Sequence, residues 1–318
     1  MILADQSLDT LEKKNQRTDT PRGIGAMRKI LEAQHLRKTF NGKAVLNEIS
    51  FQVEEGEVFG LLGPNGAGKT TMIRIILDIL KPDSGMVHLF GRQIDEKTKE
   101  LIGYLPEERG LYPKIAVFRC LKYFAELKGI KDPKNRIDFW LEKIGLLGHK
   151  NKKVGQLSKG MQQEIQFIVS ILHDPDFIIL DEPFVGLDPI NTQVIKDILL
   201  ELKSKGKTVV LSTHQMDQVE KMCDRILMIN KGKSVLYGSL ENIKAKYGRS
   251  IKVEFKGELK RIKGVKKMSN YGKYAELTLS EEVDPQAVLK ALTTQVEIRK
   301  FEISAPSLNE IFIDVAQR

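Results

Sequence analysis

The chain of 318 residues contains only two cysteines and no long hydrophobic run. Cys120 and Cys223 lie far apart, without a CxxC spacing or neighbouring histidines, which argues against a disulfide framework or a zinc site. Free thiols are typical of proteins in a reducing compartment. No apolar stretch approaches the roughly 20 residues that a membrane-spanning helix needs. These absences leave a globular protein with an ordinary apolar core.

The N-terminus lacks the apolar segment of a secretory signal. Residues 1–29 are mostly polar and are expected to form a disordered arm. Met27 precedes the first strand-like pattern, which suggests the hypothesis that it, and not Met1, is the natural start. Lys and Arg number 51 against 42 Asp and Glu, a net charge of +9. This excess suits nucleotide phosphates, nucleic acid or an anionic membrane, although a solvated basic surface is the simpler interpretation.

Strand and helix patterns alternate from about residue 30 to residue 240. The buried-strand patterns cover residues 58–62, 177–180 and 208–212, and helical patterns cover residues 70–80, 191–205 and 215–224. Residues 115–174 read as helices broken at 129–133 and 145–155, and residues 102–113 as an irregular loop. Turns at 41–42 and 230–232 each join two short strands, at 36–40 and 44–49 and at 226–229 and 234–237. This alternation predicts an α/β fold with a mainly parallel sheet, whose ligands lie beyond the carboxyl ends of the strands.

After about residue 240 the pattern changes to that of a small α+β domain, residues 241–318. Half-exposed strands are expected at 250–255 and 274–279, and helices at 285–292 and 307–315, the last opened by a capping box of Ser307 and Glu310. No catalytic constellation lies here. Dimer stabilisation, regulation and simple packing all remain open as roles, and the many lysines are expected to be solvated surface more than a lipid-binding face.

A glycine-rich loop follows the first buried strand. It reads Gly63-Pro64-Asn65-Gly66-Ala67-Gly68-Lys69-Thr70, with Thr71 next, and fits the pattern G-x-x-x-x-G-K-[ST]. Glycines let backbone N–H groups converge on phosphate oxygens, and the helix that begins near Lys69 adds its dipole. Lys69 supplies a charge for the β and γ phosphates, and the Thr70 hydroxyl can ligate Mg²⁺. A strand before the loop and a helix after it make a chance match improbable.

The second buried strand ends in two carboxylates, Asp181 and Glu182. Alone, this is a weak signal, because acidic residues are common at strand ends. Beside a phosphate loop, Asp181 is expected to hold Mg²⁺, and Glu182 is expected to orient or deprotonate the attacking water.

With these two motifs in place, residues 31–240 resemble the ATP-binding subunits of ABC transporters. Further motifs follow in the family's order: Ile102 to Glu107 resembles the Q-loop, Leu157-Ser158-Lys159-Gly160-Met161 the signature, Gly186-Leu187-Asp188 the D-loop, and Ser212-Thr213-His214 the switch histidine. Phe40 stands at the place of the aromatic that stacks on adenine. The sequence departs from the family pattern at Lys159 and Met161, which replace glycine and glutamine, and at Glu107, which replaces glutamine.

The resemblance implies a P-loop NTPase core with a helical subdomain at about 114–175, the cofactors ATP and Mg²⁺, and a composite site. Two subunits, as a homodimer or with a second ATPase subunit, would face head to tail, so that the signature of one caps the ATP of the other. Glu182 and His214 would be catalytic, and Thr70, Glu107 and Asp181 would hold the metal. The implied partner is a membrane permease on a separate polypeptide, with this chain peripheral on the cytoplasmic face.

Within the family, residues 103–113, the signature and the C-terminal extension look like those of NatA-type export ATPases, a subgroup associated with sodium extrusion. The main alternative is a soluble ABC ATPase acting on nucleic acid or ribosomes. Such proteins usually carry two modules or an inserted coiled coil, and neither is present, so no nucleic-acid partner is expected. A GTPase is disfavoured because Asn230-Lys231-Gly232-Lys233 lacks the aspartate that reads guanine. A small-molecule kinase would have no use for the signature.

Overall fold

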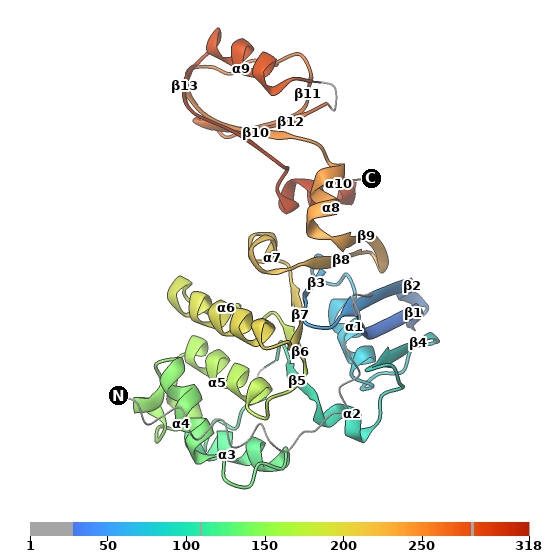
Figure 1. The fold of residues 1–318 in the computed structure, drawn as a ribbon, viewed down its shortest axis with the longest axis vertical. Helices are drawn as coiled ribbons and strands as arrows, with labels where there is room; N and C mark the ends of the chain where they lie inside the picture. Colours follow the sequence, from blue (N-terminus) through green and yellow to red (C-terminus); the bar gives the residue numbers. More distant parts are fainter. Residues whose placement is uncertain (1–27, 109, 281–282, 318) are drawn as a thin grey trace, which may run out of the picture.

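The computed structural model describes residues 28–108, 110–280 and 283–317 (Figure 1). No helix in these ranges is long and apolar enough to cross a membrane. The expected disordered arm and the suggested start at Met27 fall on residues 1–27, outside the described residues. Lys29, placed in that arm by the sequence, already begins the first strand, β1.

A six-stranded sheet forms the centre of the described chain, in the order β5-β6-β7-β3-β8-β9. Its strands are β3 (Val58–Leu62), β5 (Ile102–Leu105), β6 (Phe177–Asp181), β7 (Thr208–Thr213), β8 (Arg225–Asn230) and β9 (Lys233–Ser239). All neighbouring pairs are parallel except β8 and β9, which form an antiparallel hairpin. The predicted parallel sheet and its C-terminal hairpin are confirmed.

The edge strand β5 corrects the prediction of an irregular loop over residues 102–113, which is wrong for the first four residues. Gly103 weakened the strand signal, because glycine has low β propensity. Packing requires glycine at this position, because a Cβ at Gly103 would lie 2.1 Å from the carbonyl oxygen of Ser170. The missing side chain lets this strand lie directly against helix α5 (Lys159–Ile171).

A second sheet is antiparallel, in the order β2-β1-β4, and the sequence did not predict it as a unit. Its strands are β1 (Lys29–Phe40), β2 (Lys43–Glu54) and β4 (Ser84–Leu89). Asn41 and Gly42 join β1 to β2 with φ of 49° and 78°, the left-handed turn expected between them. The expectation of short strands is wrong, because β1 and β2 each run for 12 residues. The pairing of β1 with β2 is irregular, and His35 and Glu48 have positive φ. These irregularities interrupt the alternation of apolar and polar residues that would have predicted two long strands.

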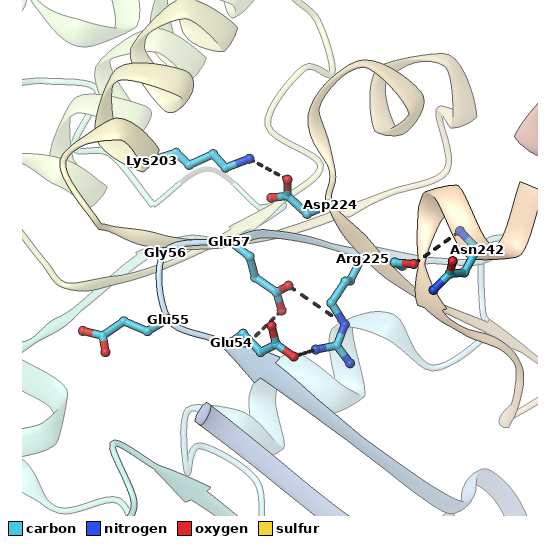
Figure 2. Close-up of a pocket in the computed structure, with 9 residues that line it drawn as sticks. Glu54, Glu55, Gly56, Glu57, Lys203, Asp224, Arg225 and Asn242 are labelled. Carbon is cyan, nitrogen blue, oxygen red and sulfur yellow. Dashed lines mark hydrogen bonds and ion pairs between the residues drawn. The ribbon is translucent and has the colours of Figure 1, made fainter. Parts of the chain in front are cut away.

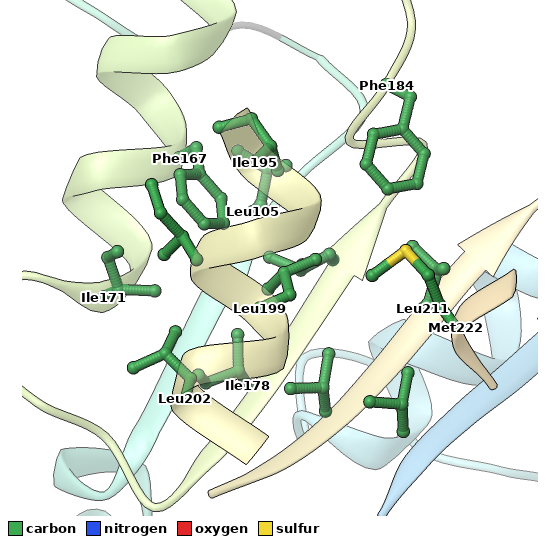
Figure 3. Close-up of a cluster of buried hydrophobic side chains, with 14 of the residues drawn as sticks. Leu105, Phe167, Ile171, Ile178, Phe184, Ile195, Leu199, Leu202, Leu211 and Met222 are labelled. Carbon is green, nitrogen blue, oxygen red and sulfur yellow. The ribbon is translucent and has the colours of Figure 1, made fainter. Parts of the chain in front are cut away.

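The two faces of the central sheet have separate cores, as the period-2 geometry of a strand requires. In β6, Phe177 and Ile179 pack with the antiparallel sheet and α1 (Lys69–Ile76), whereas Ile178 and Leu180 pack with the helices on the other face. Those helices are α3 (Val117–Leu127), α4 (Lys134–Lys143), α5, α6 (Pro189–Ser204) and α7 (Met216–Met222). Figure 3 shows this second core between α5, α6 and the sheet.

The helix expectations are confirmed with shifted ends. The segment 115–174 holds α3, α4 and α5, and its second break contains two short 3₁₀ turns, Leu147–His149 and Val154–Gln156. Helix α1 ends at Ile76, four residues before the predicted end, and Asp78 then takes a left-handed conformation. A short helix, α2 (Glu96–Glu100), was not predicted.

The C-terminal part forms a lobe that extends away from the rest of the molecule (Figure 1). Its antiparallel sheet has the order β11-β12-β10-β13. The lobe consists of β10 (Ser250–Lys256), β11 (Val265–Asn270), β12 (Tyr274–Leu279), α9 (Pro285–Thr293) and β13 (Glu297–Ser304), and it has its own apolar core. The sequence missed β11 and β13.

Two further helices, α8 (Leu240–Lys246) and α10 (Leu308–Gln317), connect this lobe to the part of the molecule that is built on the central sheet. Buried Leu308 and Ile311 of α10 belong to the core that contains α7. Glu220 of α7 accepts a hydrogen bond from the Leu308 N–H at 2.9 Å and pairs with Lys244 at 2.9 Å. The capping box that opens α10 is confirmed, with the Ser307 N–H donating to Glu310 at 2.7 Å. The C-terminal lobe is therefore attached to the helix that follows His214.

Candidate functional site

The phosphate loop lies between β3 and α1, at the carboxyl edge of the central sheet. Three of its glycines have positive φ: Gly63 (152°), Gly66 (77°) and Gly68 (111°). A Cβ at Gly63 would lie 2.3 Å from the Ile229 carbonyl oxygen. At Gly68 it would lie 2.9 Å from a backbone oxygen of β2. These positions need glycine for both conformation and space.

The first turn of α1 is open to an anion. Its N-cap, Gly68, provides no side-chain cap, and Lys69, Thr70 and Thr71 form the turn whose N–H groups have no intrahelical partner. Within the loop, Ala67 is buried, whereas Asn65 and Gly66 are exposed. The carbonyl oxygen of half-buried Pro64 accepts the Ala67 N–H at 3.1 Å. Backbone donors and the positive end of a helix dipole in this arrangement are suited to phosphate.

Lys69 is buried within this loop. Its ammonium donates to the carbonyl oxygen of Gly63 at 2.8 Å and lies 3.9 Å from a carboxylate oxygen of Glu182. The structure therefore brings the loop cation and the second carboxylate together, as the sequence motifs require.

Thr70 and Asp181 form the pair expected to hold Mg²⁺. The Thr70 hydroxyl donates to Asp181 Oδ2 at 3.1 Å, and Asp181 Oδ1 is buried with no hydrogen-bond partner among the described residues. Burial also raises the pKa of Asp181 above its usual range. A buried carboxylate oxygen without a partner, beside a hydroxyl, fits a hard divalent cation, which takes oxygen ligands and stabilises the charged carboxylate.

Glu182 is held on three sides at the end of β6. Its backbone is left-handed (φ 51°), and its side chain is 6% exposed. Thr213 donates to Oε2 at 3.1 Å, and His214 Nδ1 lies 2.8 Å from Oε1. Glu182 and His214 meet because β6 and β7 are parallel neighbours that end at the same edge. The positive φ at a residue with a side chain marks a constrained, chemically significant position.

The predicted Q-loop residue Glu107 is exposed just after β5. Tyr104 lies on β5, three residues before Glu107. Burial raises the pKa of Tyr104 to about 12, and the charges of Asp181 and Glu107 act in the same direction. Because β5 and β6 are parallel neighbours, the carboxyl end of β5 lies at the same edge of the sheet as Asp181.

The predicted adenine contact, Phe40, ends β1 and is 44% exposed. The ammonium of Lys38 lies 5.6 Å from its ring centroid, and Lys38 also pairs with Asp83 at 2.8 Å. An exposed ring with a fixed neighbour is available for stacking, whereas a core role would have buried it.

The signature opens helix α5. Ser158 is its N-cap and accepts the Met161 N–H at 3.2 Å. Leu157 is buried and Lys159 is exposed. Gly160 faces the D-loop, where a Cβ would lie 3.0 Å from the Gly186 carbonyl oxygen.

The D-loop leads into α6. Asp188 caps this helix and accepts the Asn191 N–H at 2.9 Å. A hollow of about 700 Å³, lined by Gly186, Leu187, Lys196 and His214 among others, lies beside it. Among the described residues, no hydrogen bond or ion pair joins the signature to the phosphate loop of the same chain.

A second hollow, of about 580 Å³, lies at the opposite ends of β3 and β8 (Figure 2). It contains Glu54, Glu57, Lys203, Asp224 and Arg225, none of which the sequence motifs include. The Glu57 side chain accepts the Glu54 N–H at 2.8 Å and lies 4.0 Å from Arg225. Burial raises the pKa of Glu57 to about 7. These charged side chains form ion pairs with one another, which is typical of a structural network.

Sequence reasoning missed two residues of the site, both on α5. Gln163 and Gln166 are buried, and their amides hydrogen-bond to the backbone that follows β6 and β5, respectively. The available signal was two glutamines three residues apart, a spacing that places both on one face of the helix.

The family described as "ABC transporter" matches residues 46–185, and "ATP-binding protein DrrA1-3-like, C-terminal domain" matches residues 238–316. An uncharacterized ABC transporter ATP-binding protein of Methanocaldococcus jannaschii is 44% identical over 290 residues, which cover 91% of this chain and 100% of the relative. YhaQ of Bacillus subtilis is 38% identical and covers 90% and 98%. NatA of Bacillus subtilis is 37% identical but covers 63% of this chain and 84% of NatA.

Two solved structures are similar at 29% identity. One is an ATP-binding subunit of an ABC transporter, with a TM-score of 0.64 over 69% of this chain and 93% of the other. The second is CbiO1 of Clostridium perfringens, described as part of the ABC transporter complex CbiONQ, with a TM-score of 0.60 over 69% and 91%.

The chain belongs to the ATP-binding subunits of ABC transporters and carries a DrrA-like C-terminal domain. It is an ATPase with the P-loop NTPase fold, as the motifs predicted. These similarities do not favour the soluble nucleic-acid ATPase considered as the alternative.

Proposed function

We propose that this chain splits Mg²⁺-ATP at the edge of its central sheet to drive a membrane permease on a separate polypeptide. The observation that carries the proposal is Glu182, buried between Lys69, Thr213 and His214. Phosphoryl transfer needs mainly positioning and charge neutralisation. Glu182 orients the attacking water. His214 holds the Glu182 carboxylate in place through its hydrogen bond and lies on the side of the site that the γ phosphate would occupy.

The remaining residues bind the nucleotide and metal. The backbone of the loop from Gly63 to Thr71 and the Lys69 ammonium hold the phosphates, and Phe40 stacks on adenine. Thr70, Asp181 and Glu107 would hold Mg²⁺. A metal bound there would supply positive charge to neutralise the phosphate oxygens.

We propose that the signature acts on the ATP of a second subunit, in a homodimer or with a different ATPase chain. Ser158 and Gly160 stand at the N-terminus of α5, where a phosphate is favoured by the helix dipole. Lys159 is exposed beside them and adds a positive charge. ATP then joins the two subunits, and its hydrolysis releases them, which supplies the two states of the motor.

The permease is proposed to dock where the Q-loop segment meets α3. Three rings cluster there: Tyr112 stands 5.7 Å from Tyr123 and 6.1 Å from Phe124, between ring centroids. Tyr112 and Tyr123 are 48% and 43% exposed, and aromatic residues are enriched at interfaces. The similarity to CbiO1, part of a transporter complex, supports a separate permease and a peripheral position on the cytoplasmic face of the membrane.

The finer assignment is to the NatA-type export ATPases, with the ATPase domain at residues 30–240, its helical subdomain at about 114–175, and the accessory domain at 241–318. The partial similarity to NatA supports this subgroup and gives weaker support to sodium as cargo. The attachment of α10 to α7 favours a regulatory or stabilising role for the accessory domain.

The test is ATP-dependent dimer formation by the full chain, measured by light scattering after gel filtration. Glu182→Gln is expected to bind Mg²⁺-ATP and remain dimeric, because it retains binding but loses turnover. Adding Ser158→Arg to this variant is expected to leave it monomeric with nucleotide affinity unchanged. Ser234→Arg, an exposed change on β9, serves as the matched control and is expected to dimerise. A stable dimer with Ser158→Arg would overturn the composite site.

A further inference from the structure

Helix α5 carries a buried polar stripe that the nucleotide chemistry does not explain. Gln163, Gln166 and Ser170 are each 4% exposed or less and occupy one side of the helix. Burying a primary amide is unfavourable unless it is hydrogen-bonded. The Nε2 of each glutamine lies within hydrogen-bond distance of main-chain oxygens in the loops that follow β5 and β6, whereas Gln166 Oε1 is buried without a partner among the described residues.

Gln166 holds the Q-loop at two points. Its Nε2 donates to the carbonyl oxygen of Pro106 at 3.0 Å and to that of Glu108 at 3.1 Å. Since both partners are acceptors, only the nitrogen of the side chain can face them, and the orientation of the amide is fixed. The two contacts lie on either side of Glu107, so they restrain the backbone that aims its side chain.

The same face of α5 also contacts the residues that follow β6. Gln163 Nε2 lies 3.3 Å from the carbonyl oxygen of Pro183 and 3.5 Å from that of Glu182. At the other end of the stripe, Gly103 of β5 packs against the Ser170 backbone. Helix α5 is therefore fixed to β5, to the Q-loop and to the residue after Asp181.

We infer that Gln166 is a positioning residue for ATP hydrolysis, which couples the signature helix to the Q-loop by fixing the backbone around Glu107. The inference rests on the metal-binding role proposed for Glu107. Because Ser158 caps the N-terminus of α5, a movement of this helix on subunit closure is transmitted through the Gln166 amide to Glu107. The coupling does not require Gln166 to touch nucleotide.

The test is a double-mutant cycle between Gln166→Met and Glu107→Ala in the full chain, with steady-state hydrolysis of Mg²⁺-ATP as readout. Methionine keeps the length of the side chain and removes both hydrogen bonds. Gln166→Met is expected to lower kcat about tenfold, the effect of losing two hydrogen bonds of ordinary strength, with KM for ATP unchanged. It is also expected to raise the Mg²⁺ concentration for half-maximal rate. In the Glu107→Ala background the same substitution is expected to have no further effect.

If Glu107→Ala hydrolyses ATP like the wild type, the metal role of Glu107 fails. If Glu107→Ala is impaired but Gln166→Met is not, or if the two losses multiply, Gln166 does not act through Glu107. Gln295→Met is the control, since it removes a glutamine-to-backbone bond (Lys260 N–H, 3.0 Å) in the C-terminal lobe and should leave kcat unchanged. Should Gln166→Met not fold, Gln166→Glu keeps the shape, replaces the donor with an acceptor, and is expected to give the same loss.

Discussion

Gly63→Ala tests whether the phosphate loop is set by close backbone contact. The added Cβ would stand 2.3 Å from the Ile229 carbonyl oxygen, whereas real Cβ contacts stay above 3.0 Å. Loop and β8 must therefore separate by at least about 0.7 Å. The positive φ of 152° adds backbone strain. Together these should lower the free energy of unfolding by about 2–4 kcal/mol and displace the N–H groups that face phosphate.

Urea unfolding followed by the fluorescence of the single tryptophan, Trp140, measures the stability change, and titration with a fluorescent ATP analogue measures affinity. Gly42→Ala is the matched control, because its φ is 78° but nothing lies within 4 Å of the added Cβ. It should cost only the left-handed strain, about 1 kcal/mol. Equal destabilisation by the two substitutions, or normal ATP affinity in Gly63→Ala, would refute the reasoning.

Three further perturbations follow from the geometry. Lys69→Ala removes the buried loop ammonium and should weaken ATP binding by about 10- to 100-fold, the cost of a charged hydrogen bond, as measured by equilibrium titration; unchanged affinity would argue against the assignment. Glu57 has a folded pKa of about 7, above its ordinary 4.5, so the stability it contributes is complete below about pH 4.5 and lost as pH rises through about 7. Glu57→Gln should therefore abolish about 1–2 kcal/mol of decline in unfolding free energy between pH 5 and pH 8, and an unaltered pH profile would contradict this. Leu308→Ala should cost about 2–3 kcal/mol locally, because the side chain is fully buried against the α7 core; it should release α10 and speed amide exchange in α7, and unchanged exchange would show that the contact is not stabilising.

The proposed catalytic edge of the central sheet could be predicted from sequence, because each of its motifs is a short run of neighbouring residues. The phosphate loop needs glycines, a lysine and a threonine in one short run, and Asp181 and Glu182 follow directly on a buried strand. Parallel neighbours in a sheet end at the same edge, so the motif after β7 had to lie near Glu182. The site therefore follows from strand order and a few residue types.

The missed features depend on contacts between distant segments. β5 was not predicted because Gly103 serves the packing of α5, a tertiary demand that local propensity does not contain. The stripe of Gln163 and Gln166 acquires meaning only when the ends of β5 and β6 lie beside it. The attachment of α10 to α7 likewise joins residues 88 positions apart, Glu220 and Leu308.

The central claim is that Glu182, held by Lys69, Thr213 and His214, activates the water that hydrolyses ATP bound at the phosphate loop. Its most direct test is single-turnover hydrolysis of Mg²⁺-ATP by the full chain and by Glu182→Gln, with affinity measured in parallel. The account predicts a loss of about 10²-fold or more in rate, as for removal of a general base, with affinity within about threefold of the wild type. Hydrolysis by Glu182→Gln at the wild-type rate would contradict it.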